Sequence, residues 1–527
     1  MTELGRRPGV ARRTALLGAT GLAMLLAGCT VGGGDGGDDA ATPTSGRSST
    51  PGDTAGVSAP PGTGIERFYT QPLDWEDCSE DGDGFECATL VVPLDYADPD
   101  GDTITIAINR LPAIGRALGS LIVNPGGPGG SGLDYARGGE TVASPDVLKR
   151  YDLVGFDPRG VGQSTPLDCI DDSQLDDFLS IDGSPDDATE AAALDQAAAD
   201  FADACESNGG DLLPHLSTED VARDLDVLRG ALGDDKLTYL GKSYGTFIGA
   251  TYADLFPDKV GHVVLDGAVD PAQDVKDASL DQGKGFDAAL AAFAADCQTY
   301  SDCPIKGDVA AGVAKVGAFL DIVDATPIRV GSRDLTQALA ILGIAVTLYD
   351  RENGWGLLRR ALGEGFSGDG STLMQLSDIY TDRNPDGTYA SNADEVIYAV
   401  TCLDHGAQPD LAEVATWLPE FQAAAPIFGP YVAYGNLPCA HWPVAPVDQP
   451  HAIAATGAAP ILVVGTTRDP ATPYASAQAL ASELDSGVLL TYDGDGHTAY
   501  RKGSPCVDDA VDAYLISGTV PPAGTTC

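Results

Sequence analysis

The chain has 527 residues, which is enough for one large domain with an insertion or for two domains. Acidic side chains outnumber basic ones by 78 to 30, and the formal net charge is −48. A charge of this sign and size excludes nucleic-acid binding through phosphate contacts. We interpret most of the acidic side chains as solvated surface that keeps the protein soluble.

Residues 1–28 are typical of a bacterial lipoprotein signal peptide. Four arginines precede an apolar run at 15–27, which is too short to span a bilayer. The run ends in Leu-Ala-Gly-Cys at 26–29, which resembles a lipobox. The pattern predicts cleavage before Cys29 and a lipid on its thiol, after export by either the Sec or the Tat route.

Residues 29–64 are predicted to form a flexible linker. After Cys29 the segment is Gly, Asp, Ser, Thr and Pro almost throughout, a composition that cannot bury a core. No other segment is apolar for long enough to cross a membrane. We therefore expect an exported protein, lipid-anchored to the outer face of the bacterial cytoplasmic membrane, with release from the cell as the alternative.

The cysteine count agrees with export. Of the 11 cysteines, ten remain when the lipid-bearing Cys29 is set aside, and in an oxidising compartment ten form up to five disulfides. The sequence does not determine the connectivity. We expect neighbours along the chain to pair: Cys78–Cys87, Cys169–Cys205, Cys297–Cys303, Cys402–Cys439 and Cys506–Cys527. No Cys-x-x-Cys or His-x-x-x-His spacing is present, so we expect neither a metal site nor another cofactor.

Short apolar runs that alternate with helical patterns predict a mostly parallel sheet wrapped by helices. The strand-like runs are 90–92, 104–108, 121–123, 152–156, 237–240, 262–265, 461–464 and 488–491. Between 273 and 430 this alternation stops, and apolar residues such as Phe286, Leu290, Phe293 and Cys297 recur at helical spacing. We predict a core at 65–272 and 431–527 with a helical cap inserted between its two parts.

Residues 241–245 read Gly-Lys-Ser-Tyr-Gly and stand between a strand-like run and a helix-like run, 246–255. In this context the G-x-S-x-G pattern predicts a nucleophile elbow, a sharp turn that exposes the Ser243 hydroxyl. An ordinary glycine-rich turn is the alternative, because the five-residue pattern alone is weak.

A serine nucleophile needs a base and an acid, which follow it in the order Asp, then His, in this kind of fold. Asp469 follows the apolar run 461–465, and His497 follows the run 488–491. Loops at strand ends suit both roles, because the imidazole must be accessible and held by backbone. The alternatives are a turn-forming aspartate before Pro470 and a surface histidine.

The segment 124–132, NPGGPGGSG, follows a strand-like run and brings backbone close to any ligand there. A phosphate-binding loop is the rival interpretation, but the segment lacks the P-loop ending and the dinucleotide spacing. We interpret it as half of an oxyanion hole, with one N–H from this loop and one from Tyr244.

Taken together, these motifs resemble the α/β-hydrolase aminopeptidases. The closest group is the secreted or lipid-anchored tripeptidyl-aminopeptidase-like serine proteases of actinobacteria, relatives of proline iminopeptidase. The resemblance covers about residue 65 to the end and rests on NPGGPGGSG (124–132), GFDPRGVGQS (155–164), GKSYG (241–245), LDGAVDP (265–271), RDPATP (468–473) and GHT (496–498).

The resemblance implies an α/β-hydrolase fold with a cap, and it implies roles for individual residues. Ser243 would be the nucleophile, Asp469 and His497 its partners, and Gly127 with Tyr244 the oxyanion donors. Thr472 matches a position that supports the aspartate in some relatives, and Asp157 and Arg159 match a structural motif.

An exopeptidase must recognise a free amino terminus, which requires a carboxylate in or under the cap. Asp404 is the first candidate, because related enzymes carry an acid after a cysteine near this point. Glu395 and Asp266 are weaker candidates, and an ordinary helix-capping carboxylate is the alternative for each.

Three functions follow. The first is a serine exopeptidase that releases short peptides, such as tripeptides, from free amino termini of peptides or proteins through an acyl-enzyme. The second is an envelope carboxylesterase or lipase with the same triad, because the same chemistry serves both. The third is a non-catalytic envelope binding protein, against which the complete Ser/Asp/His set argues.

The lipobox interpretation predicts the behaviour of a Cys29 variant. In a bacterium that processes lipoproteins, the protein should partition with membranes and incorporate labelled fatty acid. Cys29→Ala should lose the label and be either released or left unprocessed, because the lipid is attached through the thiol. A Cys29→Ala protein that still carried labelled fatty acid would show that the interpretation is wrong.

Overall fold

The structure is a computed structural model that describes residues 59–80, 82–406 and 408–527. The predicted signal peptide, Cys29 and most of the linker lie outside the described residues, so the predictions about export and anchoring stay predictions. Within the described ranges, every helix is too short or too polar to cross a membrane.

In the described part of the chain, nine strands form one sheet in the order β1-β2-β3-β5-β4-β6-β7-β10-β11. The six strands from β5 to β11 in this order are parallel, and β1 to β3 add an antiparallel edge. All eight predicted strands belong to this sheet, which confirms the predicted fold class. The strands are β1 (Glu76–Asp77), β2 (Glu86–Pro93), β3 (Thr103–Leu111), β4 (Ser120–Asn124), β5 (Asp152–Phe156), β6 (Leu237–Lys242), β7 (Val260–Asp266), β10 (Ile461–Arg468) and β11 (Gly487–Asp495).

Both faces of the sheet are buried, which explains why its central strands are continuous apolar runs. Successive residues of a strand point to opposite faces, so Ile122 and Val123 belong to different cores. One core packs against α6 (Thr218–Ala231), α7 (Tyr244–Leu255) and α17 (Tyr474–Glu483), and the other against α2 (Gly132–Arg137), α3 (Pro145–Leu148) and α18 (Pro505–Ser517). The short helices α1 (Glu66–Tyr69), η1 (Gly139–Thr141), η2 (Gly210–His215) and η3 (Pro257–Lys259) lie in the connections.

A large helical segment separates β7 from β10. It contains α8 (Val275–Cys297), α9 (Val309–Ala325), α10 (Gln337–Leu348), α11 (Arg351–Gly365), α12 (Ser371–Tyr380), α13 (Ala393–Asp404), α14 (Leu411–Ala424), α15 (Gly429–Tyr434) and α16 (Leu437–Ala440). The stripe of Phe286, Leu290, Phe293 and Cys297 is buried in this segment's own core. A two-stranded sheet of β8 (Ile328–Val330) and β9 (Arg333–Leu335) was not predicted, because three-residue strands are too short to show alternation.

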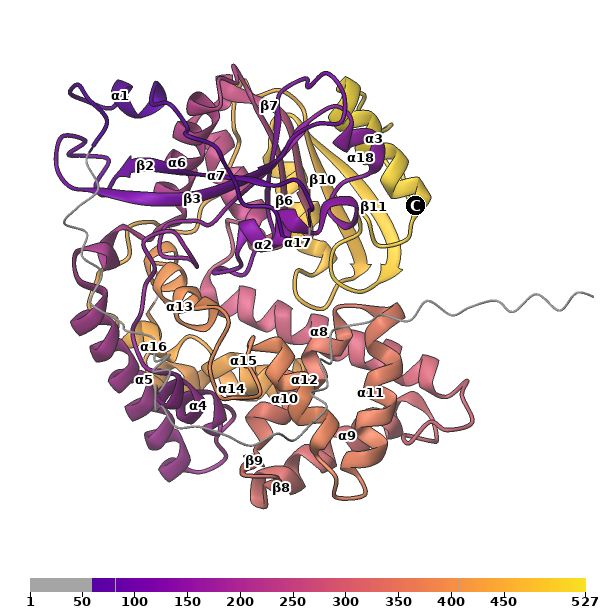
Figure 1. Ribbon diagram of the computed structural model, residues 1–527. Helices are drawn as coiled ribbons and strands as arrows, with labels where there is room; N and C mark the ends of the chain where they lie inside the picture. The colour runs from indigo at the N-terminus through magenta and orange to yellow at the C-terminus, as the bar shows by residue number, and fades with distance from the viewer. Residues whose placement is uncertain (1–58, 81, 407) are drawn as a thin grey trace, which may run out of the picture. The chain divides into compact units, whose positions relative to one another are not determined.

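Two helices from the first part of the predicted core pack with this insertion. They are α4 (Asp172–Ser180) and α5 (Ala188–Gly209), which lie between β5 and α6 in the chain. Leu194 and Ala198 of α5 share a buried cluster with Trp417 and Phe421 of α14. The helical layer of the protein is therefore built from two separate segments of sequence (Figure 1).

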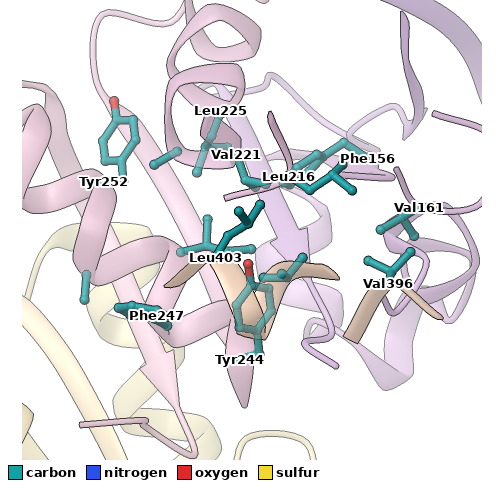
Figure 2. Packing of buried hydrophobic residues seen from close by; sticks show 14 of the residues in the cluster. Phe156, Val161, Leu216, Val221, Leu225, Tyr244, Phe247, Tyr252, Val396 and Leu403 are labelled. Atoms are coloured by element: carbon teal, nitrogen blue, oxygen red, sulfur yellow. The ribbon is translucent and has the colours of Figure 1, made fainter. Parts of the chain in front are cut away.

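Helix α13 belongs to the insertion but packs into the core. Its Val396 and Leu403 lie in one buried cluster with Leu216, Val221 and Tyr244 (Figure 2). The insertion is thus joined to the sheet domain through a shared hydrophobic core, which fixes α13 beside the strand ends.

The five predicted disulfides are all present, which confirms the neighbour pairing. The Asp157 and Arg159 side chains serve the fold, as the resemblance implies. Asp157 accepts the N–H of Gln163 at 2.9 Å, and the fully buried Arg159 bonds to Asp224 at 2.7 Å. Burial alone would lower the pKa of the guanidinium, but the Asp224 carboxylate outweighs that effect and raises it.

Candidate active site

Ser243 occupies a strained turn between β6 and α7. Its φ is 55° and its ψ is −128°, a backbone conformation that residues other than glycine rarely adopt. The turn is so tight that a Cβ on Gly241 would collide with the Gly245 carbonyl oxygen. Both glycines of the pattern are therefore needed for the elbow, and the strain at Ser243 is typical of a functional site.

Asp469 follows β10, and His497 follows β11. In the sheet, β7 lies beside β6, β10 lies beside β7, and β11 is the edge strand beyond β10. The His497 Nδ1 lies 2.8 Å from one carboxylate oxygen of Asp469 and 3.0 Å from the other. Asp469 is buried and also accepts the N–H groups of Ala471, Thr472 and Thr498 at 3.0, 2.9 and 3.0 Å. These bonds fix the aspartate as an acceptor that orients the imidazole.

Thr472 contributes in the way that the resemblance implies. Its N–H bonds to Asp469, and its hydroxyl oxygen lies 3.4 Å from His497 Nδ1. It therefore contacts both partners of the predicted acid–base pair.

Ser243 and His497 both lie beside the end of β7. The Ser243 N–H donates to the Asp266 carbonyl oxygen at 3.0 Å, and a Cβ on the next residue, Gly267, would lie 3.3 Å from His497 Cε1. Within the described chain, the Ser243 hydroxyl makes no hydrogen bond, so the bond between Ser243 and His497 in the proposed triad is not formed in this structure. Such bonds often tighten only when substrate is bound.

The glycine loop lies directly against the elbow. A Cβ on Gly126, whose φ is 101°, would come within 2.8 Å of Ser243 Cβ and 3.0 Å of the Tyr244 nitrogen. Among the described residues, the N–H groups of Gly127 and Tyr244 have no acceptor. Two free donors beside a strained serine suit an oxyanion hole, which stabilises the charge that develops on a substrate carbonyl.

A cavity of about 460 Å³ opens over the elbow. Ser243, Tyr244 and Gly127 line it on the core side, and residues of α5, α8, α10, α12 and α13 line it on the other. The helical layer therefore covers the space above Ser243 and controls which molecules reach it.

Asp404, the carboxylate predicted for the substrate amine, lines this cavity but is held by the protein. One of its oxygens accepts the Thr218 N–H at 2.8 Å and the other accepts the Thr218 hydroxyl at 2.5 Å. The Thr218 hydroxyl also lies 2.5 Å from the Tyr244 hydroxyl. Burial raises the pKa of Asp404 to about 7, although the Thr218 bonds act in the opposite direction.

A second carboxyl in the cavity, Asp394, was missed by the sequence analysis. It lies at the first turn of α13, where Ala393 packs against Gly129 of the glycine loop. Asp394 is partly buried and has no hydrogen-bond or ion-pair partner among the residues that the structure describes. Burial, and then the nearby carboxylates of Asp382 and Glu395, raise its pKa to about 7.

Aromatic side chains surround Asp394. Three tyrosines near Asp394 also line the cavity: Tyr380, Tyr398 and Tyr431. Burial raises the pKa of each phenol, and the negative charge of Asp394 raises each pKa further. The sequence contains a signal for Asp394. Asp394, Tyr398, Thr401 and Asp404 are spaced by three or four residues, so they lie on one face of α13.

The two weaker candidates for the amine are used inside the fold. Glu395 is buried and accepts the N–H groups of Cys169 and Ile170, each at 2.9 Å. Asp266 is fully buried and accepts N–H groups of the loop after His497. Neither carboxylate lines the cavity, so the structure corrects both suggestions.

Comparison with known proteins places the chain in a family. The profile of "TAP-like protein" matches residues 425–527, and the profile of "alpha/beta hydrolase fold" matches residues 119–321. Serine protease Hip1 of Mycobacterium tuberculosis is 41% identical over 480 residues, covering 87% of this chain and 91% of that protein. The chain is a TAP-like α/β hydrolase.

Two further relatives of this hydrolase carry different activity names. Carboxylesterase B of Mycobacterium tuberculosis is 38% identical over 455 residues, covering 84% of this chain and 86% of that protein. Tripeptidyl aminopeptidase of Streptomyces lividans is 34% identical over 470 residues, covering 86% of each chain. The TAP-like hydrolase is a serine hydrolase, and its cavity must decide between ester and peptide substrates.

If Ser243 is the nucleophile, a fluorophosphonate should label it covalently. Ser243→Ala should abolish labelling and lower kcat by about 10⁴-fold or more with the fold intact. Ser279→Ala is a matched control, because Ser279 lines the same cavity and its loss should leave labelling in place. Turnover by Ser243→Ala within tenfold of the unmodified enzyme would remove the assignment.

Proposed function

We propose that this protein is a serine aminopeptidase that releases short peptides, such as tripeptides, from free amino termini. The observation that carries the proposal is Asp394, an ionisable carboxyl that lines the same cavity as Ser243 and has no partner among the residues that the structure describes. An ester or an amino-blocked peptide has no ammonium group to form an ion pair with such a carboxylate. A substrate ammonium would supply the missing partner.

The proposed reaction is acyl transfer. His497 takes the proton of the Ser243 hydroxyl as the oxygen attacks the scissile carbonyl, and Asp469 stabilises the imidazolium that forms. The N–H groups of Gly127 and Tyr244 donate to the oxyanion. His497 then protonates the leaving amine, and water releases the peptide from the acyl-enzyme by the reverse sequence.

We assign amine recognition first to Asp394 rather than to Asp404. Both carboxyls line the cavity at opposite ends of α13, and both have a pKa of about 7. Asp404 already accepts two hydrogen bonds from Thr218, whereas Asp394 is left without a donor by the described residues. A substrate ammonium therefore binds more favourably to Asp394 than to Asp404. Asp404 serves mainly to hold Tyr244 through Thr218.

The named relatives support the peptidase part of the proposal. One is a serine protease and another a tripeptidyl aminopeptidase. The alternative is an esterase, which the relative named carboxylesterase B favours. A panel of chromogenic peptides with free and acetylated amino termini, together with short acyl esters, separates the two. Preference for esters with equal rates on free and acetylated peptides would retire the aminopeptidase proposal.

We also infer that the enzyme works outside the cytoplasm. The five disulfides of the described chain support this, because such bonds persist in oxidising compartments. The predicted signal and lipid attachment at Cys29 would hold it at the membrane surface.

Substitution of the two cavity carboxyls should give different patterns. Asp394→Asn should lower kcat/KM on free-amine peptides by about 30-fold or more, because the substrate ammonium loses its partner in a desolvated site. It should change the rate on acetylated peptides or esters by less than about threefold. Asp404→Asn, the matched variant on the same helix, should lower all three rates together, because Tyr244 loses its support. A selective loss in Asp404→Asn, with none in Asp394→Asn, would return the assignment to Asp404.

The pH dependence should carry the same signature. Because the pKa of Asp394 is raised to about 7, its carboxylate is lost as the pH falls through that value. The ratio of kcat/KM on a free-amine peptide to that on its acetylated form should therefore fall below about pH 7, while the contribution of His497 cancels. Above about pH 8 the ratio should fall again, because the substrate amine itself loses its proton. Asp394→Asn should remove the acidic limb; a ratio that does not vary with pH would contradict the assignment.

A further inference from the structure

Lys242 and Asp266 form a buried charged pair beneath the catalytic edge. They are the last residues of β6 and β7, and they are register partners across these parallel strands. The Lys242 Nζ lies 3.6 Å from an Asp266 carboxylate oxygen. Lys242 is 7% exposed and Asp266 is fully buried, a rare environment for charged side chains.

Asp266 contacts both catalytic segments. Its carbonyl oxygen accepts the N–H of Ser243 at 3.0 Å. Its carboxylate accepts the N–H groups of Ala499 at 2.9 Å and Tyr500 at 3.0 Å, two and three residues after His497. One residue therefore ties the backbone of the nucleophile to the loop that carries the histidine.

Lys242 closes the same connection from the other strand. Its ammonium donates to the Tyr500 carbonyl oxygen at 2.7 Å. Its own carbonyl oxygen lies at the glycine loop, 2.6 Å from where a Cβ of Gly126 would be. Lys242 thus contacts the His497 loop through its side chain and the glycine loop through its backbone.

Burying this charged pair costs free energy, so its presence in the core needs a physical explanation. Burial lowers the pKa of Lys242 and raises that of Asp266, and each charge offsets part of the effect on the other. Apolar side chains of similar size would fill this space without that cost. They would not accept two N–H groups and donate to a carbonyl of the same loop.

We propose that Lys242 and Asp266 are positioning residues that hold the His497 loop at a fixed place relative to Ser243. They do not touch the reacting atoms; they act through the backbone of residues 499 and 500. The proposal rests on Ser243 and His497 being the catalytic pair. It is independent of whether the substrate is a peptide or an ester, because both use the same two residues.

The test compares full-length variants of this pair with a buried pair away from the site. Asp266→Asn and Lys242→Met are measured for kcat, KM, thermal stability and the rate of fluorophosphonate labelling, which needs no substrate. We expect kcat and the labelling rate to fall by about 30-fold or more in Asp266→Asn and by about tenfold in Lys242→Met, because small misplacements of catalytic groups are that costly. KM should stay within threefold in both.

Asp224→Asn is the matched control, since Asp224 pairs with the buried Arg159 but contacts neither catalytic loop. It should lower the thermal stability while the folded enzyme keeps kcat and labelling rate within threefold.

If Asp266→Asn does not fold, Lys242→Met alone decides, because it leaves the two N–H bonds of Asp266 in place. A folded Asp266→Asn or, failing that, a folded Lys242→Met with unchanged kcat and labelling rate would overturn the proposal. A loss that only follows the unfolded fraction, as in the control, would overturn it too. If labelling responds as expected but no peptide is cleaved, the aminopeptidase proposal fails while the positioning role stands.

Discussion

The loop that carries His497 is held by two buried carboxylates that stand at the ends of neighbouring parallel strands. Asp469, after β10, accepts the N–H of Thr498, and Asp266, at the end of β7, accepts those of Ala499 and Tyr500. Buried N–H groups without acceptors cost on the order of 1–3 kcal/mol each, so this loop has few other places to go. The bonds that satisfy the loop backbone also bring the imidazole to the edge of the sheet at which Ser243 lies.

The helical insertion is part of the same construction. Helix α13 shares a hydrophobic cluster with α6 and α7, and the carbonyl of Tyr349, at the end of α10, accepts the N–H of His497 at 2.9 Å. The cavity over the elbow is therefore lined by segments that are tied to the proposed catalytic residues. The access to the cavity and the geometry of the proposed triad depend on the same set of contacts.

The buried and half-buried carboxylates of this protein differ in the hydrogen-bond donors that surround them. Asp469 and Asp266 are surrounded by N–H groups and orient a loop, Asp404 is occupied by Thr218, and Asp394 lacks a donor from the described residues. A carboxylate that the fold has satisfied is a structural element, and one that the fold has left open is available to a ligand cation. In a chain with 78 acidic residues, this difference separates the proposed recognition group, Asp394, from the many solvated acids.

The sequence by itself determined the strands of the sheet and the order of the proposed triad along the chain. Apolar strands and the glycine-bounded Ser243 are patterns within single segments, so they can be recognised without knowing what lies far away in the chain. The neighbour pairing of the cysteines was one of many possible connectivities, and the folded structure selected it. The tertiary structure alone decided that α4 and α5 join the insertion and that Lys242 faces Asp266. It also decided that, among the described residues, Asp404 has hydrogen-bond donors and Asp394 has none. Each of these depends on a partner tens to hundreds of residues away. A side chain's burial and its hydrogen-bond donors are properties of the folded neighbourhood, and no pattern within the segment itself records them.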